Sequence, residues 1–69
     1  MTKEEINHLF TYHSPKPEQL PKYQTIRDAA KQFAEVINDL VPDSADKSAA
    51  MRKLRECVMT ANAAIALNS

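Results

Sequence analysis

The sequence contains no glycine, no tryptophan and a single cysteine, and its only aromatic residues are two tyrosines and two phenylalanines. Without glycine, the chain can form neither a glycine-rich phosphate loop nor a dinucleotide-binding fingerprint. The lone Cys57 excludes an intrachain disulfide, and no histidine lies at a zinc-site spacing from it. A single free thiol is typical of proteins of a reducing cytoplasm.

The chain also lacks an excess of charge and long apolar runs. Nine basic and nine acidic residues give a formal net charge of zero. General binding of DNA or RNA polymers needs a basic surface, so we expect no such partner, although a local basic patch is compatible with this balance. The apolar runs fall far short of the roughly 20 residues that span a bilayer, and "MTKEEINHLF" has no signal-peptide core. We therefore expect no membrane association.

The length of 69 residues predicts one domain, residues 1–69. A chain of this size buries only about 60% of the surface that its unfolded form exposes. Small domains usually add disulfides, a metal or a partner subunit. Because the sequence indicates neither a disulfide nor a metal site, and no cofactor, we expect a homo-oligomer.

Two proline-bearing breaks divide the chain into three predicted helices, at about residues 3–10, 18–41 and 44–67. In the first, Thr2 and Glu5 have the spacing of a capping box. This helix has about two turns and must dock on something to be stable. Its apolar face consists of Ile6, Leu9 and Phe10.

The second helix can start anywhere between Pro17 and Pro21, and Pro42 ends it. Its apolar residues recur at spacings of three and four, which is typical of a long amphipathic helix. They are Leu20, Tyr23, Ile26, Ala30, Phe33, Ile37 and Leu40.

The third helix carries a narrow seam with spacings of three, four, three and four, as in a coiled coil. The connection to it is so short that the two long helices must fold back antiparallel. The predicted fold is therefore all-α: a short N-terminal helix plus an antiparallel two-helix hairpin. The many alanines of the third helix favour a second packed face against another copy, with simple helix filling as the alternative. The seam residues are Met51, Leu54, Val58, Ala61 and Ile65.

No residue pattern specifies an enzyme. Cys57 lies beside the seam, where we expect a buried structural thiol. His8 lies away from the apolar face of its helix and is expected to face solvent. Glu4, Glu5 and Glu18 fall in the first turns of helices, where the helix dipole accounts for them.

Three groups of residues are candidates for binding. Tyr23, Arg27 and Lys31 follow each other at intervals of four and form a stripe that could stack a base and hold phosphates. The alternative, which spacing alone favours, is a solvated face on which Asp28 and Glu35 pair with the cations.

In the bend "LFTYH", Phe10 is expected to plug the end of the hairpin, whereas Tyr12 is equally suited to packing and to stacking on a ligand. In "MTANAAIALNS", Thr60 and Asn62 could face a ligand or a neighbouring subunit, although the helix pattern favours ordinary surface polarity.

The stretches "LFTYHSP", "YQTIRDAAKQFAEVI" and "SADKSAAMRKLRECVMTANAAIALN" resemble, in this order, the small bacteriophage anti-CBASS sponge proteins. The resemblance covers nearly the whole chain. It implies a homohexamer that binds cyclic dinucleotides such as cyclic GMP–AMP in pockets between protomers, without cleaving them. Some such proteins hold cyclic trinucleotides at a second site, for which no residue is matched here. The implied location is the cytoplasm of the infected bacterial host.

Two ligand contacts follow from the resemblance. Tyr12 matches the tyrosine on which a base stacks. Arg27 matches a basic residue, often lysine, that contacts phosphate, so the donor geometry would differ here. Some relatives use a basic residue near the C-terminus, where this chain has Leu67. The rival hypothesis is a helical hairpin that docks on another protein and binds no nucleotide.

Overall fold

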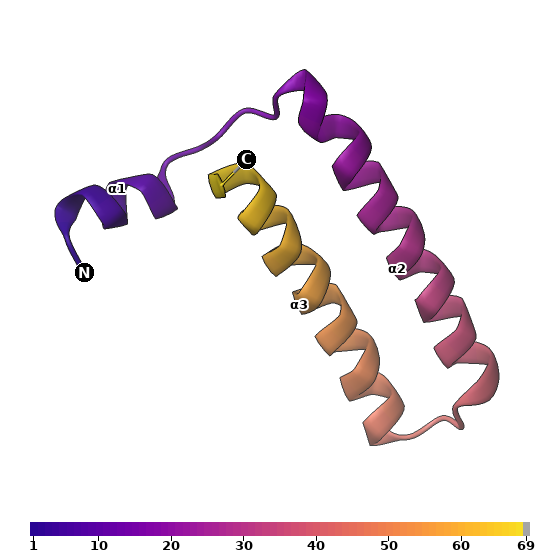
Figure 1. Cartoon of the computed structure of the whole chain (residues 1–69). Helices are drawn as coiled ribbons and strands as arrows, with labels where there is room; N and C mark the ends of the chain where they lie inside the picture. Colours follow the sequence, from indigo (N-terminus) through magenta and orange to yellow (C-terminus); the bar gives the residue numbers. More distant parts are fainter. Residues whose placement is uncertain (69) are drawn as a thin grey trace.

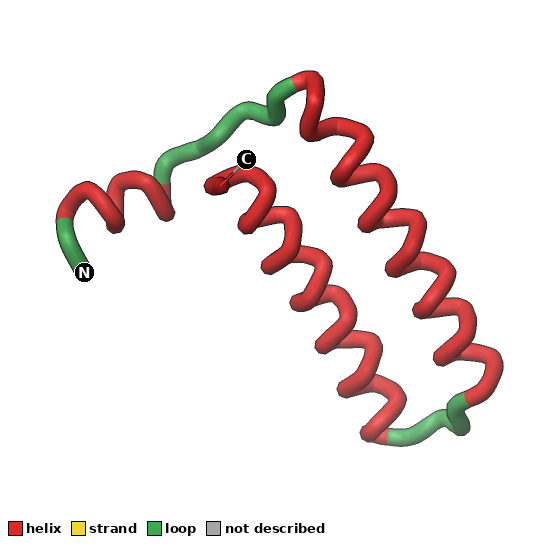
Figure 2. Tube along the Cα trace, in the orientation of Figure 1, coloured by secondary structure: helices red, strands yellow, loops and turns green. Residues whose placement is uncertain are grey.

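The computed structural model describes residues 1–68 and confirms the all-α prediction. The elements are α1 (Lys3–Phe10), a 3-10 turn η1 (Pro17–Gln19), α2 (Leu20–Leu40) and α3 (Ala45–Asn68). Helices α2 and α3 lie side by side and antiparallel, while α1 projects beyond the C-terminal end of α3 (Figure 1). The described part of the chain contains helices and loops and no strand (Figure 2).

The local start signals explain where the helices begin. The capping box is present at α1, because the Glu5 amide donates to Thr2 Oγ1 at 3.0 Å and the Thr2 amide donates to Glu5 Oε1 at 3.4 Å. The sequence allowed the second helix to start anywhere between Pro17 and Pro21, and both prolines lie at the start of a helical element. Pro17 begins the 3-10 turn, and Pro21 occupies the first turn of α2, where its missing N–H costs no helical hydrogen bond.

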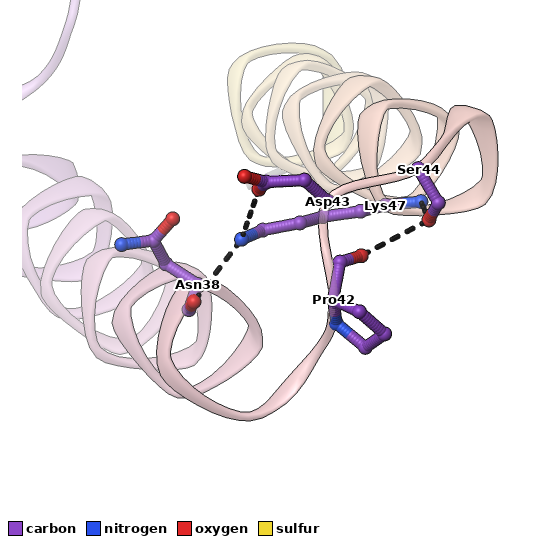
Figure 3. Close-up of polar contacts among 5 residues, drawn as sticks. All are labelled: Asn38, Pro42, Asp43, Ser44 and Lys47. Atoms are coloured by element: carbon purple, nitrogen blue, oxygen red, sulfur yellow. Dashed lines mark hydrogen bonds and ion pairs between the residues drawn. The ribbon is translucent and has the colours of Figure 1, made fainter.

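The turn between α2 and α3 is fixed by polar contacts (Figure 3). The amide of Lys47 donates to Ser44 Oγ at 3.1 Å, which caps the start of α3. The ammonium group of Lys47 reaches back across the turn to the Asn38 carbonyl at 3.1 Å and to Asp43 Oδ1 at 3.0 Å. Lys47 thus joins the last turn of α2 to the first turn of α3.

The hairpin is a single layer, because the molecule measures 45 × 29 × 13 Å along its principal axes. All five residues of the predicted α3 seam are half-buried between the helices. Among residues 1–68 no apolar side chain is fully buried. The only core of the hairpin is therefore this half-buried seam, since two helices in one layer leave both broad faces open.

The apolar face of α2 that packs against α3 is narrower than predicted. Tyr23, Ile26, Ala30 and Ile37 are half-buried as expected. Leu20 and Phe33 are each 56% exposed and Leu40 is 78% exposed, so these three do not belong to the seam. One partner helix covers only a narrow stripe of α2, and apolar residues outside that stripe face solvent in the single chain.

Two packing predictions are wrong for the single chain. Cys57 is exposed rather than buried, because it flanks the seam on a broad face that no other element covers. Phe10 is 83% exposed and does not plug the hairpin, because it ends a helix that lies beyond the end of α3 and does not cover the seam (Figure 1).

None of the helices described, across residues 1–68, combines the length and the apolar character that crossing a membrane requires.

Candidate functional site

A groove of about 460 Å³ lies on one broad face of the hairpin, between α2 and α3. Its cations are Arg27 and Lys31, one turn apart on α2, and Arg55 on α3. Its apolar surface is formed by Ala30, Ala34, Leu54, Val58 and Met59. Three cations around an apolar floor can hold phosphate charges while a flat, weakly polar group lies between the helices.

Arg27 is held in place by a local hydrogen-bond chain. Its Nη2 donates to Gln24 Oε1 at 2.8 Å, and Gln24 Nε2 donates to Asp28 Oδ1 at 2.8 Å. The Gln24 amide thus links Arg27 to Asp28, where the sequence suggested that acidic residues pair with the cations. This bond uses one of the five N–H donors of the guanidinium group, which orients it on the helix surface.

Of the predicted stripe, Arg27 and Lys31 line the groove together and Tyr23 does not. Tyr23 is half-buried along the interhelical side of α2. Positions four apart are neighbours on a helix, but over two such intervals the positions drift around it, so Tyr23 and Lys31 do not share one surface.

Tyr12 lies in the linker between α1 and η1, with 81% of its surface exposed. It does not line the groove that holds Arg27. Within one chain, the groove therefore supplies the cations without the Tyr12 ring.

Thr60 and Asn62, the two candidate binding residues on α3, differ in exposure and in hydrogen bonding. Thr60 is exposed and donates to the Glu56 carbonyl of its own helix at 2.9 Å. Asn62 is half-buried, and its Oδ1 atom is inaccessible to water and has no hydrogen-bond partner among the described residues. Neither of the two lines the cationic groove.

The turns on either side of the linker that carries Tyr12 are hydrogen-bonded to the last turn of α3. His8 Nε2 lies 3.1 Å from the Leu67 carbonyl oxygen, and Gln19 Nε2 donates to the Ile65 carbonyl at 3.1 Å. Gln19 is 2% exposed and is the one buried residue among residues 1–68.

Sequence reasoning missed Arg55 and Gln19. Arg55 follows the seam residue Leu54, but only the pairing of the helices shows that it faces the same groove as Arg27. Gln19 carries no sequence signal of burial, because glutamine is mostly exposed in proteins.

A family model described as Acb2/Tad1, hairpin domain, matches residues 2–66. No curated protein and no solved structure gives a significant match. Because the match covers almost the whole chain, the protein belongs to the Acb2/Tad1 hairpin-domain family, which is the family of anti-CBASS sponge proteins.

Proposed function

We propose that this protein is a non-catalytic sponge that sequesters cyclic dinucleotides, such as cyclic GMP–AMP, in the cytoplasm of an infected bacterium. Stoichiometric binding would keep the messenger from the effectors of CBASS immunity. The observation that carries the proposal is the family match over residues 2–66.

The chemistry of the cationic groove supports the proposal. A cyclic dinucleotide carries two phosphate charges and two flat bases in a preorganised ring, so it loses little conformational freedom on binding. Arg27, Lys31 and Arg55 supply cations for the phosphates. Tyr12 supplies an exposed ring, and stacking of a base on an aromatic side chain is worth about 1–3 kcal/mol. Cyclic trinucleotides offer the same phosphate and base groups and belong in the same binding panel.

The ligand would lie between two copies of the chain. Tyr12 does not line the cationic groove of its own chain, so a second copy would supply the stacking ring. A ligand with twofold symmetry fits a twofold contact, to which each copy brings one tyrosine and one set of cations. The many exposed apolar residues support assembly into a homo-oligomer, and a homohexamer is the state that we propose.

Isothermal titration calorimetry against a panel of cyclic di- and trinucleotides tests the proposal. We expect binding of at least one cyclic dinucleotide, and a loss of affinity in Tyr12→Ala and in Arg27→Ala. Arg52→Ala is the matched control, because Arg52 is exposed on α3 and does not line the groove. Recovery of intact ligand after heat denaturation would separate a sponge from a nuclease. Absence of binding at micromolar concentrations to every member of the panel would rule out the proposal.

The second candidate function is docking on another protein. It is favoured by a second, apolar groove on the hairpin, which includes Phe33 and Cys57. A single strong protein partner whose binding is unaffected by Tyr12→Ala and Arg27→Ala would support this function instead.

A further inference from the structure

The linker that carries Tyr12 is flanked by two elements, α1 and η1, that are both hydrogen-bonded to the same turn of α3. On the N-terminal side, His8 Nε2 meets the Leu67 carbonyl at 3.1 Å. On the C-terminal side, Gln19 Nε2 meets the Ile65 carbonyl at 3.1 Å. Carbonyl groups in the last turn of a helix commonly accept hydrogen bonds from outside the helix. The last turn of α3 therefore holds the segments on both sides of the linker in place.

His13, the residue after Tyr12, adds a third contact inside the linker. Its Nε2 lies 2.7 Å from the His8 carbonyl oxygen, in the last turn of α1. The rings of His8 and His13 meet edge to face, with centroids 4.9 Å apart and planes at 73°. His13 is thereby half-buried, although its neighbour Tyr12 is 81% exposed.

The direction of these bonds follows from their acceptors. A carbonyl oxygen can only accept, so both histidines must carry a hydrogen on Nε2. A chain of donors then runs from His13 to the His8 carbonyl, and from the His8 ring to the Leu67 carbonyl. These two hydrogen bonds connect His13, the residue next to Tyr12, with the C-terminal end of α3 through His8.

We propose that His13, acting through His8, is a positioning residue that fixes the linker so that the Tyr12 ring is presented to the ligand. This inference rests on the proposed function. Because Tyr12 is 81% exposed, the backbone of the linker sets where its side chain leaves the chain and which rotamers its ring can adopt. A linker that is already ordered reduces the entropy lost on binding, so loss of the His13 contact weakens binding without removing a ligand contact.

A double-mutant cycle between His13 and Tyr12 tests the inference. We expect His13→Ala to lower the affinity for a cyclic dinucleotide about 2- to 10-fold, the range of one lost hydrogen bond. In a Tyr12→Ala background the same change should have almost no effect. His13→Gln keeps a side-chain N–H donor and should recover part of the affinity. Ser14→Ala, next to His13 in the same exposed bend, is the matched control and should bind as the parent does.

Two results would overturn the inference: an unchanged affinity in His13→Ala, or an equal loss in both backgrounds. The second result would mean that His13 acts independently of Tyr12, either on the ligand itself or on the fold. Circular dichroism of each variant checks that the helices are retained.

A measurement without ligand separates this inference from the proposed function. In a Tyr23→Phe background Tyr12 is the only tyrosine left, since the chain has two and no tryptophan. The tyrosine fluorescence anisotropy should then fall in His13→Ala and stay unchanged in Ser14→Ala. If the parent protein binds no cyclic nucleotide, the proposed function fails while this measurement still decides whether His13 orders Tyr12. An unchanged anisotropy would rule out the positioning role.

Discussion

The side-chain amide of Gln19 donates a hydrogen bond to the Ile65 carbonyl across 46 positions of sequence, at 3.1 Å. Its Oε1 accepts from the Lys16 amide at 2.9 Å, so the same side chain closes the 3-10 turn and attaches it to α3. Gln19 is the one buried residue among residues 1–68, whereas the apolar seam of the hairpin is only half-buried. A polar contact thus holds the beginning of α2 against the end of α3.

Gln19→Ala should destabilise the fold by about 1–3 kcal/mol, because it leaves buried polar groups without a partner. Chemical denaturation followed by circular dichroism measures this change. Gln32→Ala is the control, since Gln32 is exposed on α2 and should change stability little. Equal stability of the two variants would show that the Gln19 contacts contribute nothing to the folded state.

Lys47→Met should lower stability by about 1 kcal/mol, because Lys47 loses its hydrogen bond to the Asn38 carbonyl while the apolar part of the side chain is kept. Asp43→Asn should change stability within the error of measurement, because the Asp43 side chain is 98% exposed and ion pairs in water contribute little. Thermal unfolding of both variants at low and high salt measures the difference. A larger loss in Asp43→Asn, suppressed by salt, would mean that the ion pair and not the carbonyl contact holds the turn.

Arg55→Ala should weaken binding of a cyclic dinucleotide by about 10- to 150-fold, because a charge-assisted contact to phosphate contributes roughly 1.5–3 kcal/mol. Calorimetry at two salt concentrations is the measurement, and the salt dependence should be shallower in the variant than in the parent. Arg52→Ala removes an equal charge from the same helix and should retain the parent affinity. Equal affinities of the two variants would mean that Arg55 does not contribute to the groove as we infer.

Phe33→Glu should dissociate the proposed homo-oligomer, because it places a charge in the apolar groove formed by both long helices. Size-exclusion chromatography with light scattering measures the mass. The thiol of Cys57 lines the same groove and should react faster with a thiol reagent in this variant than in the parent. Gln32→Glu introduces the same charge at the neighbouring exposed position and should leave the mass unchanged. An unaltered mass for Phe33→Glu would place any contact between copies elsewhere.

The broad fold could be predicted because its signals are local. The Thr2 and Glu5 capping box, Pro42 and the seam of the third helix depend on residues that are neighbours in the sequence, and each is found in the structure. The burial of Cys57 was predicted wrongly for the single chain, because the pattern of one helix does not say how many other elements cover it.

The candidate site could be predicted only in part. Arg27 and Lys31 were identified from their spacing on one helix, and they do line one groove. Arg55 joins them from another helix, and His8 and Gln19 bond to carbonyl groups of residues far along the chain. Contacts of this kind depend on which segments of the folded chain lie close together, and no local sequence pattern specifies that.

The sequence by itself determined the three helices, the antiparallel return and the family, because hydrophobic spacing, caps and prolines act over a few residues. Only the tertiary structure decided which cations share a groove and which residues fix the Tyr12 linker. Those relationships depend on how α1, α2 and α3 lie against one another. Because the two long helices form a single layer, both broad faces of the hairpin remain open for binding.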